Sequence, residues 1–114
     1  MKEKYFKVKG RYKDYIVFVK SGNFWNAFYG DAVILHYLTG YQLNNNKLGF
    51  PSKVLNKVLE KVRALNINYI LVYELDDMII HEYSSNSYIF YWKEYLSLYK
   101  IKKVNQLIDK IFLI

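Results

Sequence analysis

The side chains best suited to chemistry lie in one acidic block, YELDDMIIHEY, which runs from Tyr73 to Tyr83. Carboxylates and a histidine at this density could hold a divalent cation and hydrolyse a phosphodiester bond. The Asp-Asp pair, however, has the composition of a turn, and no lysine stands at the spacing usual for a strand carboxylate in a nuclease. We therefore predict no metal site and leave a small metal-dependent nuclease as an alternative. Its ligands would come from Glu74, Asp76, Asp77, His81 and Glu82.

Other catalytic groups are absent from the sequence or lack the context they need. The chain has no cysteine, which removes thiolate catalysis, cysteine zinc sites and disulfides. It also has no Gly-Lys pair, and hence no phosphate-cradling loop of the kind that binds ATP. His36 falls within an apolar segment and is interpreted as a core or boundary histidine. We expect no enzyme, no catalytic residue and no cofactor.

A second group of residues could contact a ligand without any reaction. The stretch SGNFWNAFYGDA, residues 21–32, places two large rings, Phe24 and Trp25, directly after a turn-forming Gly-Asn pair. If the chain is extended after this turn, alternate side chains face opposite sides of a sheet. Phe24 then shares a side with Asn26, and Trp25 faces the other way. We predict that Trp25 is a core residue and that Phe24 is held out toward a partner.

Positive charge also indicates a partner. The net charge is +7, and bases outnumber acids by seven to two in residues 1–20 and by five to one in residues 44–66. Such clustering fits a polyanion, with nucleic acid as the first choice, although an ordinary solvated surface would carry the same charges. The predicted phosphate contacts are Lys4, Lys7, Lys9, Arg11 and Lys13 from the N-terminal segment and Lys53 and Lys57 from a helix.

The patterns that must position these residues predict an α/β fold with a mixed β-sheet, hairpins and packed α-helices. Residues 15–19 form a β-branched and aromatic run typical of a buried strand, and residues 24–28 would return beside it as a hairpin. Asp31 is the expected N-cap of a helix over residues 32–39, which Gly40 would end. Residues 41–43 and 48–50 flank a polar NNNK turn and predict a second hairpin.

The second half of the chain adds two helices and two strands. Residues 68–73 are typical of another buried strand and residues 78–83 of an edge strand, followed by a loop over 84–88. Residues 92–112 carry apolar side chains at helical spacing and predict a helix, in one piece or broken near 100–102. Between the second hairpin and the buried strand, Pro51 would end a strand and Ser52 would cap a helix. Its apolar stripe comprises Val54, Leu55, Val58, Leu59, Val62 and Leu65.

With these elements in order, two stretches of the chain resemble a known family. YKDYIVFVKSGNFWNAFYGDAVIL, residues 12–35, resembles the opening of the mismatch-recognition domain (domain I) of MutS proteins. That opening has a Gly, a Phe-x-Glu motif, another Phe and an Asp-Ala helix start. LGFPSKVLNKVLEKVRALNINYILVYE, residues 48–74, is similar to the Gly-x-Pro turn, leucine-rich helix and following strand of the family. The resemblance implies a free-standing MutS domain I-like fold without an ATPase.

In that family the Phe of Phe-x-Glu wedges beside a mispaired base from the minor groove, and the Glu hydrogen-bonds the base. By position these two residues correspond to Phe24 and Asn26. The resemblance therefore implies that the partner is duplex DNA, mispaired or distorted, and that Phe24 and Asn26 contact it. Asn26 departs from the family pattern, because its amide can donate or accept a hydrogen bond but cannot act as an acid.

We expect residues 1–83 to form the MutS domain I-like domain and residues 84–114 to form a C-terminal helical extension that packs on it. That helix could instead offer a surface to a protein partner or to a second copy of the chain. A protein-interaction module, such as a mobile element could encode, is therefore the alternative to DNA binding. The sequence shows no apolar run of membrane-spanning length and no signal peptide, which predicts a cytoplasmic location without membrane contact.

Overall fold

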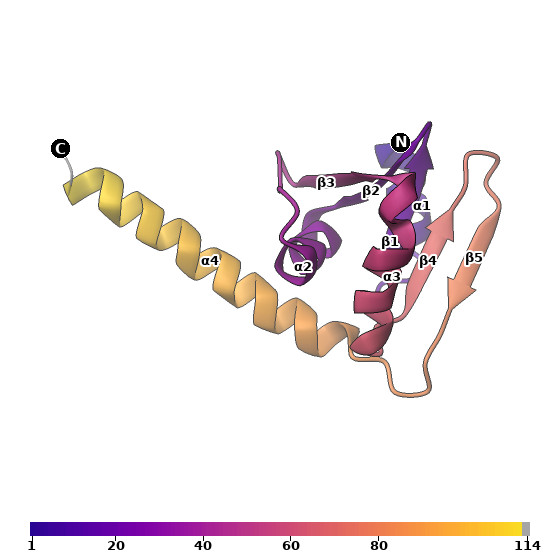
Figure 1. The fold of residues 1–114 in the computed structure, drawn as a ribbon. Helices are drawn as coiled ribbons and strands as arrows, with labels where there is room; N and C mark the ends of the chain where they lie inside the picture. Colours follow the sequence, from indigo (N-terminus) through magenta and orange to yellow (C-terminus); the bar gives the residue numbers. More distant parts are fainter. Residues whose placement is uncertain (113–114) are drawn as a thin grey trace.

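The computed structural model describes the backbone of residues 1–112 and the side chains of residues 1–107. Its centre is a five-stranded sheet in the order β3-β2-β1-β4-β5 (Figure 1). The strands are β1 (Ile16–Ser21), β2 (Phe24–Phe28), β3 (Lys47–Pro51), β4 (Tyr69–Val72) and β5 (Met78–His81). The helices are α1 (Lys2–Lys9), α2 (Tyr29–Thr39), α3 (Leu55–Ala64) and α4 (Tyr88–Phe112), and a 3-10 turn, η1 (Ser52–Val54), precedes α3.

The sheet is mixed, as the sequence predicts. β1 pairs with β4 in parallel, whereas the pairs β1–β2, β2–β3 and β4–β5 are antiparallel. A parallel pair needs a long crossover, which the segment carrying α2, β3 and α3 supplies. Every residue of β4 and the first four residues of β1 are buried, because these central strands are covered on both faces. The predicted α/β class is confirmed.

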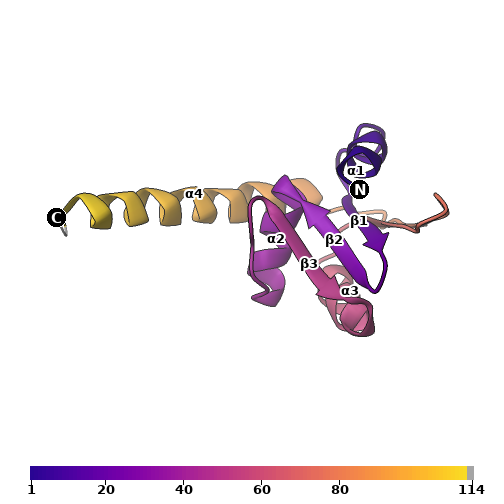
Figure 2. The same cartoon turned by 90° about the horizontal axis from the view of Figure 1, so that it is seen from above.

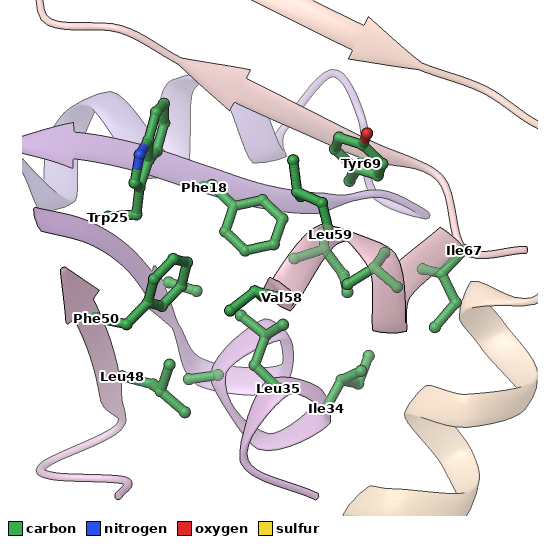
Figure 3. Close-up of a cluster of buried hydrophobic side chains, with 14 of the residues drawn as sticks. Phe18, Trp25, Ile34, Leu35, Leu48, Phe50, Val58, Leu59, Ile67 and Tyr69 are labelled. Atoms are coloured by element: carbon green, nitrogen blue, oxygen red, sulfur yellow. The ribbon is translucent and has the colours of Figure 1, made fainter. Parts of the chain in front are cut away.

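Helices cover both faces of the sheet. α1 lies on one face and packs Tyr5 and Val8 against it. α2 and α3 lie on the other side of the strands, as Figure 2 shows from above. Figure 3 shows the core on that side, where the rings of Phe18, Trp25 and Phe50 gather between the sheet and the two helices. The apolar stripe predicted for α3 faces this core, with its central residues fully buried.

Several local predictions are wrong, and long-range contacts explain them. Residues 41–43 form no strand, since β3 pairs along its whole length with β2 and not with a hairpin partner of its own. Asp31 does not cap α2, which begins earlier and has Phe28 as its N-cap. Ser52 makes no side-chain capping bond, because it is the first residue of η1 and the N-cap position of α3 falls on Val54. The basic segment at the N-terminus forms α1, a helix that the charge pattern did not reveal.

The C-terminal helix α4 is continuous and packs on the domain only through its first turns. Tyr95 stacks on Tyr37 of α2 with ring centroids 5.4 Å apart. Trp92 lies so close to Gly30 that a Cβ at that position would stand 2.5 Å from the indole Nε1. Every residue from 100 to 107 is exposed, and Figure 1 shows this part of the helix extending away from the sheet. The start of α4 therefore contacts α2, whereas residues 100–107 extend beyond it.

Two further observations concern the apolar residues of α4 and the helices as a whole. The apolar pattern also includes Ile108 and Ile111, whose side chains lie outside the described residues. Among the residues that the structure describes, none of the helices combines the length and the apolar character needed to cross a membrane.

Candidate nucleic-acid interface

The β1–β2 hairpin holds the two aromatic rings on opposite sides of the sheet. Its turn is closed by Gly22 at a φ of 58°, a conformation that glycine adopts without steric cost. Ser21 pairs with Phe24, so Phe24 is the first residue of β2 and stands at the tip of the hairpin. Phe24 is 50% exposed, whereas Trp25 is 2% exposed within the core. The predicted alternation of these rings is confirmed.

Phe24 lies at the rim of a shallow depression on the face of the sheet that carries α1. The neighbouring strand contributes Gly49, which pairs with Asn26, and Lys47, which pairs with Phe28. Because directly paired residues point to the same face, Gly49 and Lys47 lie on the α1 face, opposite to the face that Trp25 occupies. The complete lining is Met1, Ser21, Phe24, Asn26, Asn44, Lys47 and Gly49.

Asn26 forms the floor of this depression. Its residue exposure is 4%, and its Nδ2 donates a hydrogen bond to the carbonyl oxygen of Val19 at 3.3 Å. Because a carbonyl oxygen can only accept, this bond orients the amide and leaves Oδ1 as an acceptor. Oδ1 lies beneath Gly49, where a Cβ would stand 3.0 Å from it. The missing side chain at Gly49 thus keeps the space above the amide oxygen open.

The predicted basic residues do not form one continuous face. Lys7, Arg11 and Lys13 are exposed on α1 and the turn that follows it. Lys53 and Lys57 are exposed on η1 and α3, across the sheet from α1. The sheet separates these two groups of predicted phosphate contacts.

Two of the predicted phosphate contacts already have partners within the protein. Lys4 forms an ion pair with Asp76 at 3.1 Å and donates to the backbone oxygen of Glu74 at 2.9 Å. Lys9 points inward and donates to the carboxylate of Asp31 at 2.9 Å, to the hydroxyl of Tyr88 at 2.9 Å and to a backbone oxygen. These bonds use all the donors of the Lys9 ammonium, so the prediction that Lys9 contacts phosphate is corrected.

Asp31 is the centre of a buried polar cluster at the start of α2. Its side chain is fully buried and accepts hydrogen bonds from the hydroxyls of Tyr5 at 2.8 Å and Tyr88 at 2.6 Å. It also accepts from Lys9 and from the backbone N–H of Val17. Burial, and then the negative charge of Asp31, raises the pKa of both Tyr5 and Tyr88, which keeps them protonated as donors. The cluster joins α1, β1, α2 and α4.

The acidic block surrounds β5 and its turn, and most of its carboxylates bond within the chain. Asp76 lies in the turn at a φ of 67° and pairs with Lys4, which confirms the predicted turn. Glu74 accepts from the backbone N–H of Gly22 at 3.2 Å, and Glu82 accepts from the hydroxyl of Tyr15 at 2.6 Å. Within the part of the chain that the structure describes, no three acidic or histidine side chains gather closely enough to hold a metal ion.

The structure adds residues to the candidate site that the sequence patterns did not single out. Met1, Ser21, Asn44 and Lys47 line the depression with Phe24 and Asn26. Lys47 could have been found only from the pairing of β3 with β2, because that register places it on the same face as Phe24. His36 lies at the boundary of the core, as predicted, with its Nδ1 2.7 Å from the backbone oxygen of Tyr41.

A model of the family described as MutS domain I matches residues 1–77. The matched range holds both strands of the Phe24 hairpin, as well as Asn26, Gly49 and Asp31, and it ends before β5 and α4. No curated protein matches the chain.

Proposed function

The chain belongs to the MutS domain I family, and on this premise we propose that it binds duplex DNA with Phe24 as a wedge at a mispaired or distorted step. The observation that carries the proposal is the exposure of Phe24 at the tip of a hairpin whose next residue, Trp25, is buried. Apolar side chains that enter a base step from the minor groove unstack it at a cost of about a few kcal/mol, which contacts with the bent duplex offset. A ring held on a paired strand is already positioned for this.

Asn26 gives the proposed contact its chemical preference. With its amide N–H held by the backbone of Val19, the free Oδ1 can only accept a hydrogen bond. A base edge that meets this oxygen must then present a donor, such as the exocyclic amine of guanine in the minor groove or an imino N–H of a base displaced from its pair. The family's acidic residue is replaced here by a neutral acceptor at the same position.

Lysines near the depression, together with exposed cations on the helices of both faces of the sheet, would hold the phosphates. Lys47 lines the depression, and Lys53 lies two residues after Pro51, which pairs with Phe24. Lys7, Arg11, Lys13 and Lys57 are further exposed cations. Lys4 and Lys9 are not included, because both are bonded within the protein. Phosphate contacts of this kind supply affinity and carry no sequence information.

Salt dependence tests the DNA proposal directly. Each phosphate that a lysine neutralises is expected to contribute about −0.9 to the slope of log affinity against log salt. Lys53→Ala and Lys57→Ala should each weaken binding to matched and mispaired duplex alike and should flatten this slope. Fluorescence anisotropy of labelled duplexes over a salt series measures both effects.

Lys103→Ala, at an exposed position on the projecting part of α4, is the matched control and should leave the slope unchanged. Binding that is indifferent to salt would remove nucleic acid as the partner.

We also propose that the domain is not an enzyme. The purified chain should release no phosphate from ATP, because its sequence has no phosphate-cradling loop. It should not cleave duplex in the presence of Mg²⁺ or Mn²⁺, because the acidic block within the described residues does not gather a set of metal ligands. Asp76→Asn serves as the control for the acidic block, since asparagine tolerates the positive φ at this turn position. Metal-dependent cleavage that this substitution abolishes would instead establish the nuclease.

The exposed part of α4 supports a second candidate function, a protein-interaction module. Leu98, Ile101, Val104 and Leu107 are each between 46% and 60% exposed on the projecting part of the helix. Apolar side chains gathered in this way are typical of a surface that meets another protein or a second helix. Absence of duplex binding, together with a specific protein that co-purifies with the wild type but not with Ile101→Lys, would favour this candidate over DNA recognition.

A further inference from the structure

The two edges of the sheet differ in how they are protected. An edge strand presents unpaired backbone groups, and proteins usually block them with charged residues, proline or bulges. The β3 edge follows this rule, because it contains Lys47, Gly49 and Pro51. The β5 edge carries no such residue, and Met78, Ile79 and Ile80 are 39%, 53% and 40% exposed. An exposed apolar edge strand of this kind is a template for pairing with another strand.

The hydrogen-bond pattern shows which backbone groups of β5 are free. The backbone N–H of Tyr73 donates to the oxygen of Asp77 at 2.8 Å, which fixes the phase of the β4–β5 ladder. In an antiparallel pair the bonded positions alternate, so Ile79 and His81 also turn their backbone groups toward β4. Met78 and Ile80 then point their N–H and C=O groups outward, away from the sheet. These are the groups that an additional strand would bond.

We propose that two copies of the chain pair along β5 in an antiparallel ladder and form one continuous ten-stranded sheet. The backbone groups of Met78 and Ile80 both form hydrogen bonds within a symmetric β5 pair when Met78 of one copy lies opposite Ile80 of the other. This register places Ile79 opposite Ile79 of the second copy. The two-fold axis is perpendicular to the sheet, so the α1 faces of the two copies lie on the same side of the combined sheet. Opposed residues therefore point to the same face.

From Asp77 to His81 the opposed side chains match in this register. Met78 and Ile80 lie on the α1 face, since they pair with Val72 and Ile70, and each would contact the other's equivalent across the ladder. On the opposite face, Asp77 would stand opposite His81 of the second copy on both sides of the central Ile79 pair. A carboxylate opposite an imidazole can share a hydrogen bond. A shift of the register would remove the Asp77–His81 pairing or leave fewer backbone groups hydrogen-bonded between the copies.

In this register Asp76 comes opposite Glu82 of the second copy at each end of the ladder, and these like charges weaken the pairing. Asp76 already has Lys4 as its counter-charge, and Glu82 accepts from Tyr15. A four-residue edge buries less surface than a standard interface. The proposed dimer is therefore weak and depends on protein concentration. It is independent of DNA binding, because β5 lies at the edge of the sheet remote from β3 and the Phe24 depression.

Cysteine crosslinking tests the register. The chain has no cysteine, so Ile79→Cys introduces a single thiol. Residues opposite each other in a non-hydrogen-bonded pair have Cα atoms about 4.5 Å apart, which lies within the range for a disulfide. Ile79→Cys should therefore give a covalent dimer on mild oxidation, as seen on a non-reducing gel. Met78→Cys should not, because its equivalent would be displaced along the ladder beyond the range of about 7 Å that a disulfide can bridge. Ile101→Cys, 57% exposed on α4, controls for collision between exposed thiols.

Sedimentation velocity over a range of protein concentrations tests the association itself. The wild type should show a concentration-dependent shift toward the dimer, and Ile79→Lys should abolish it, because two like charges would face each other at the centre of the ladder. Ile101→Lys should leave the shift intact. Circular dichroism verifies that both variants are folded. A monomer at every concentration, crosslinking of Ile79→Cys no faster than that of Ile101→Cys, or loss of the dimer in Ile101→Lys alone would each overturn the proposal.

Discussion

Asp31→Asn is expected to lower the free energy of unfolding by about 3–5 kcal/mol, because it breaks a buried ion pair from one side. The carboxylate is surrounded by donors: the hydroxyls of Tyr5 and Tyr88, the ammonium of Lys9 and the N–H of Val17. An amide would turn an NH₂ group toward some of these donors and would leave Lys9 without its counter-charge in a largely buried place. Urea unfolding followed by circular dichroism measures the change.

Asp76→Asn is the matched control for this prediction. Asp76 also pairs with a lysine, at 3.1 Å compared with 2.9 Å for the pair of Asp31 and Lys9. Its side chain is 80% exposed, whereas that of Asp31 is fully buried. An exposed ion pair contributes about 0–1 kcal/mol, so Asp76→Asn should change stability little. If the two variants lose similar amounts of unfolding free energy, burial does not explain how much the Asp31 cluster contributes to stability.

Trp25→Ala and Phe24→Ala are expected to have opposite effects, although the two residues are neighbours. Trp25 packs inside the core, with its ring 5.1 Å from that of Tyr73, and its removal should cost about 3–5 kcal/mol of stability. Phe24 is half exposed, so Phe24→Ala should leave the fold nearly unchanged. Under the proposed function it should instead reduce the preference for mispaired over matched duplex, a preference expected to be about 1 kcal/mol.

Thermal unfolding and duplex binding of the two variants together check this pair of predictions. If Phe24→Ala unfolds the protein as severely as Trp25→Ala does, Phe24 is a structural residue and the wedge is wrong. If Phe24→Ala is stable and binds mispaired duplex as the wild type does, the wedge is also wrong, although a basic surface could still bind DNA. Lys53→Ala in the same assay separates the two contributions, because a phosphate contact affects matched and mispaired duplex equally.

Local patterns in the sequence predicted most of the elements and the placement of the two rings. The apolar runs of β1 and β4, the apolar stripe of α3 and the left-handed stop at Gly40 are confirmed. So is the separation of Phe24 from Trp25, because alternation along an extended strand depends only on the local geometry of the backbone. The motifs around Phe24 also indicated the family that the match over residues 1–77 shows.

Contacts between residues far apart in the chain determine the pairing of β3 and the exposure of each lysine, which local patterns did not predict. β3 pairs with β2 because its alternation places Leu48 and Phe50 in the core beside Trp25, and the same register brings Lys47 and Gly49 to the depression. Charge counting could not tell an exposed lysine from a buried one, since that depends on folded neighbours.

Lys9 illustrates the difference most directly. In the sequence it is one base among several at the N-terminus, and the pattern predicted a phosphate contact. In the structure it bonds to Asp31 and to Tyr88, which lies 79 residues further along the chain. Lys9, the last residue of α1, is largely buried because its ammonium has a counter-charge, and only the tertiary fold brings Asp31 to it. The order of residue types decides which side chains alternate along a strand and which are charged, whereas the folded neighbours decide which of those charges can reach a partner.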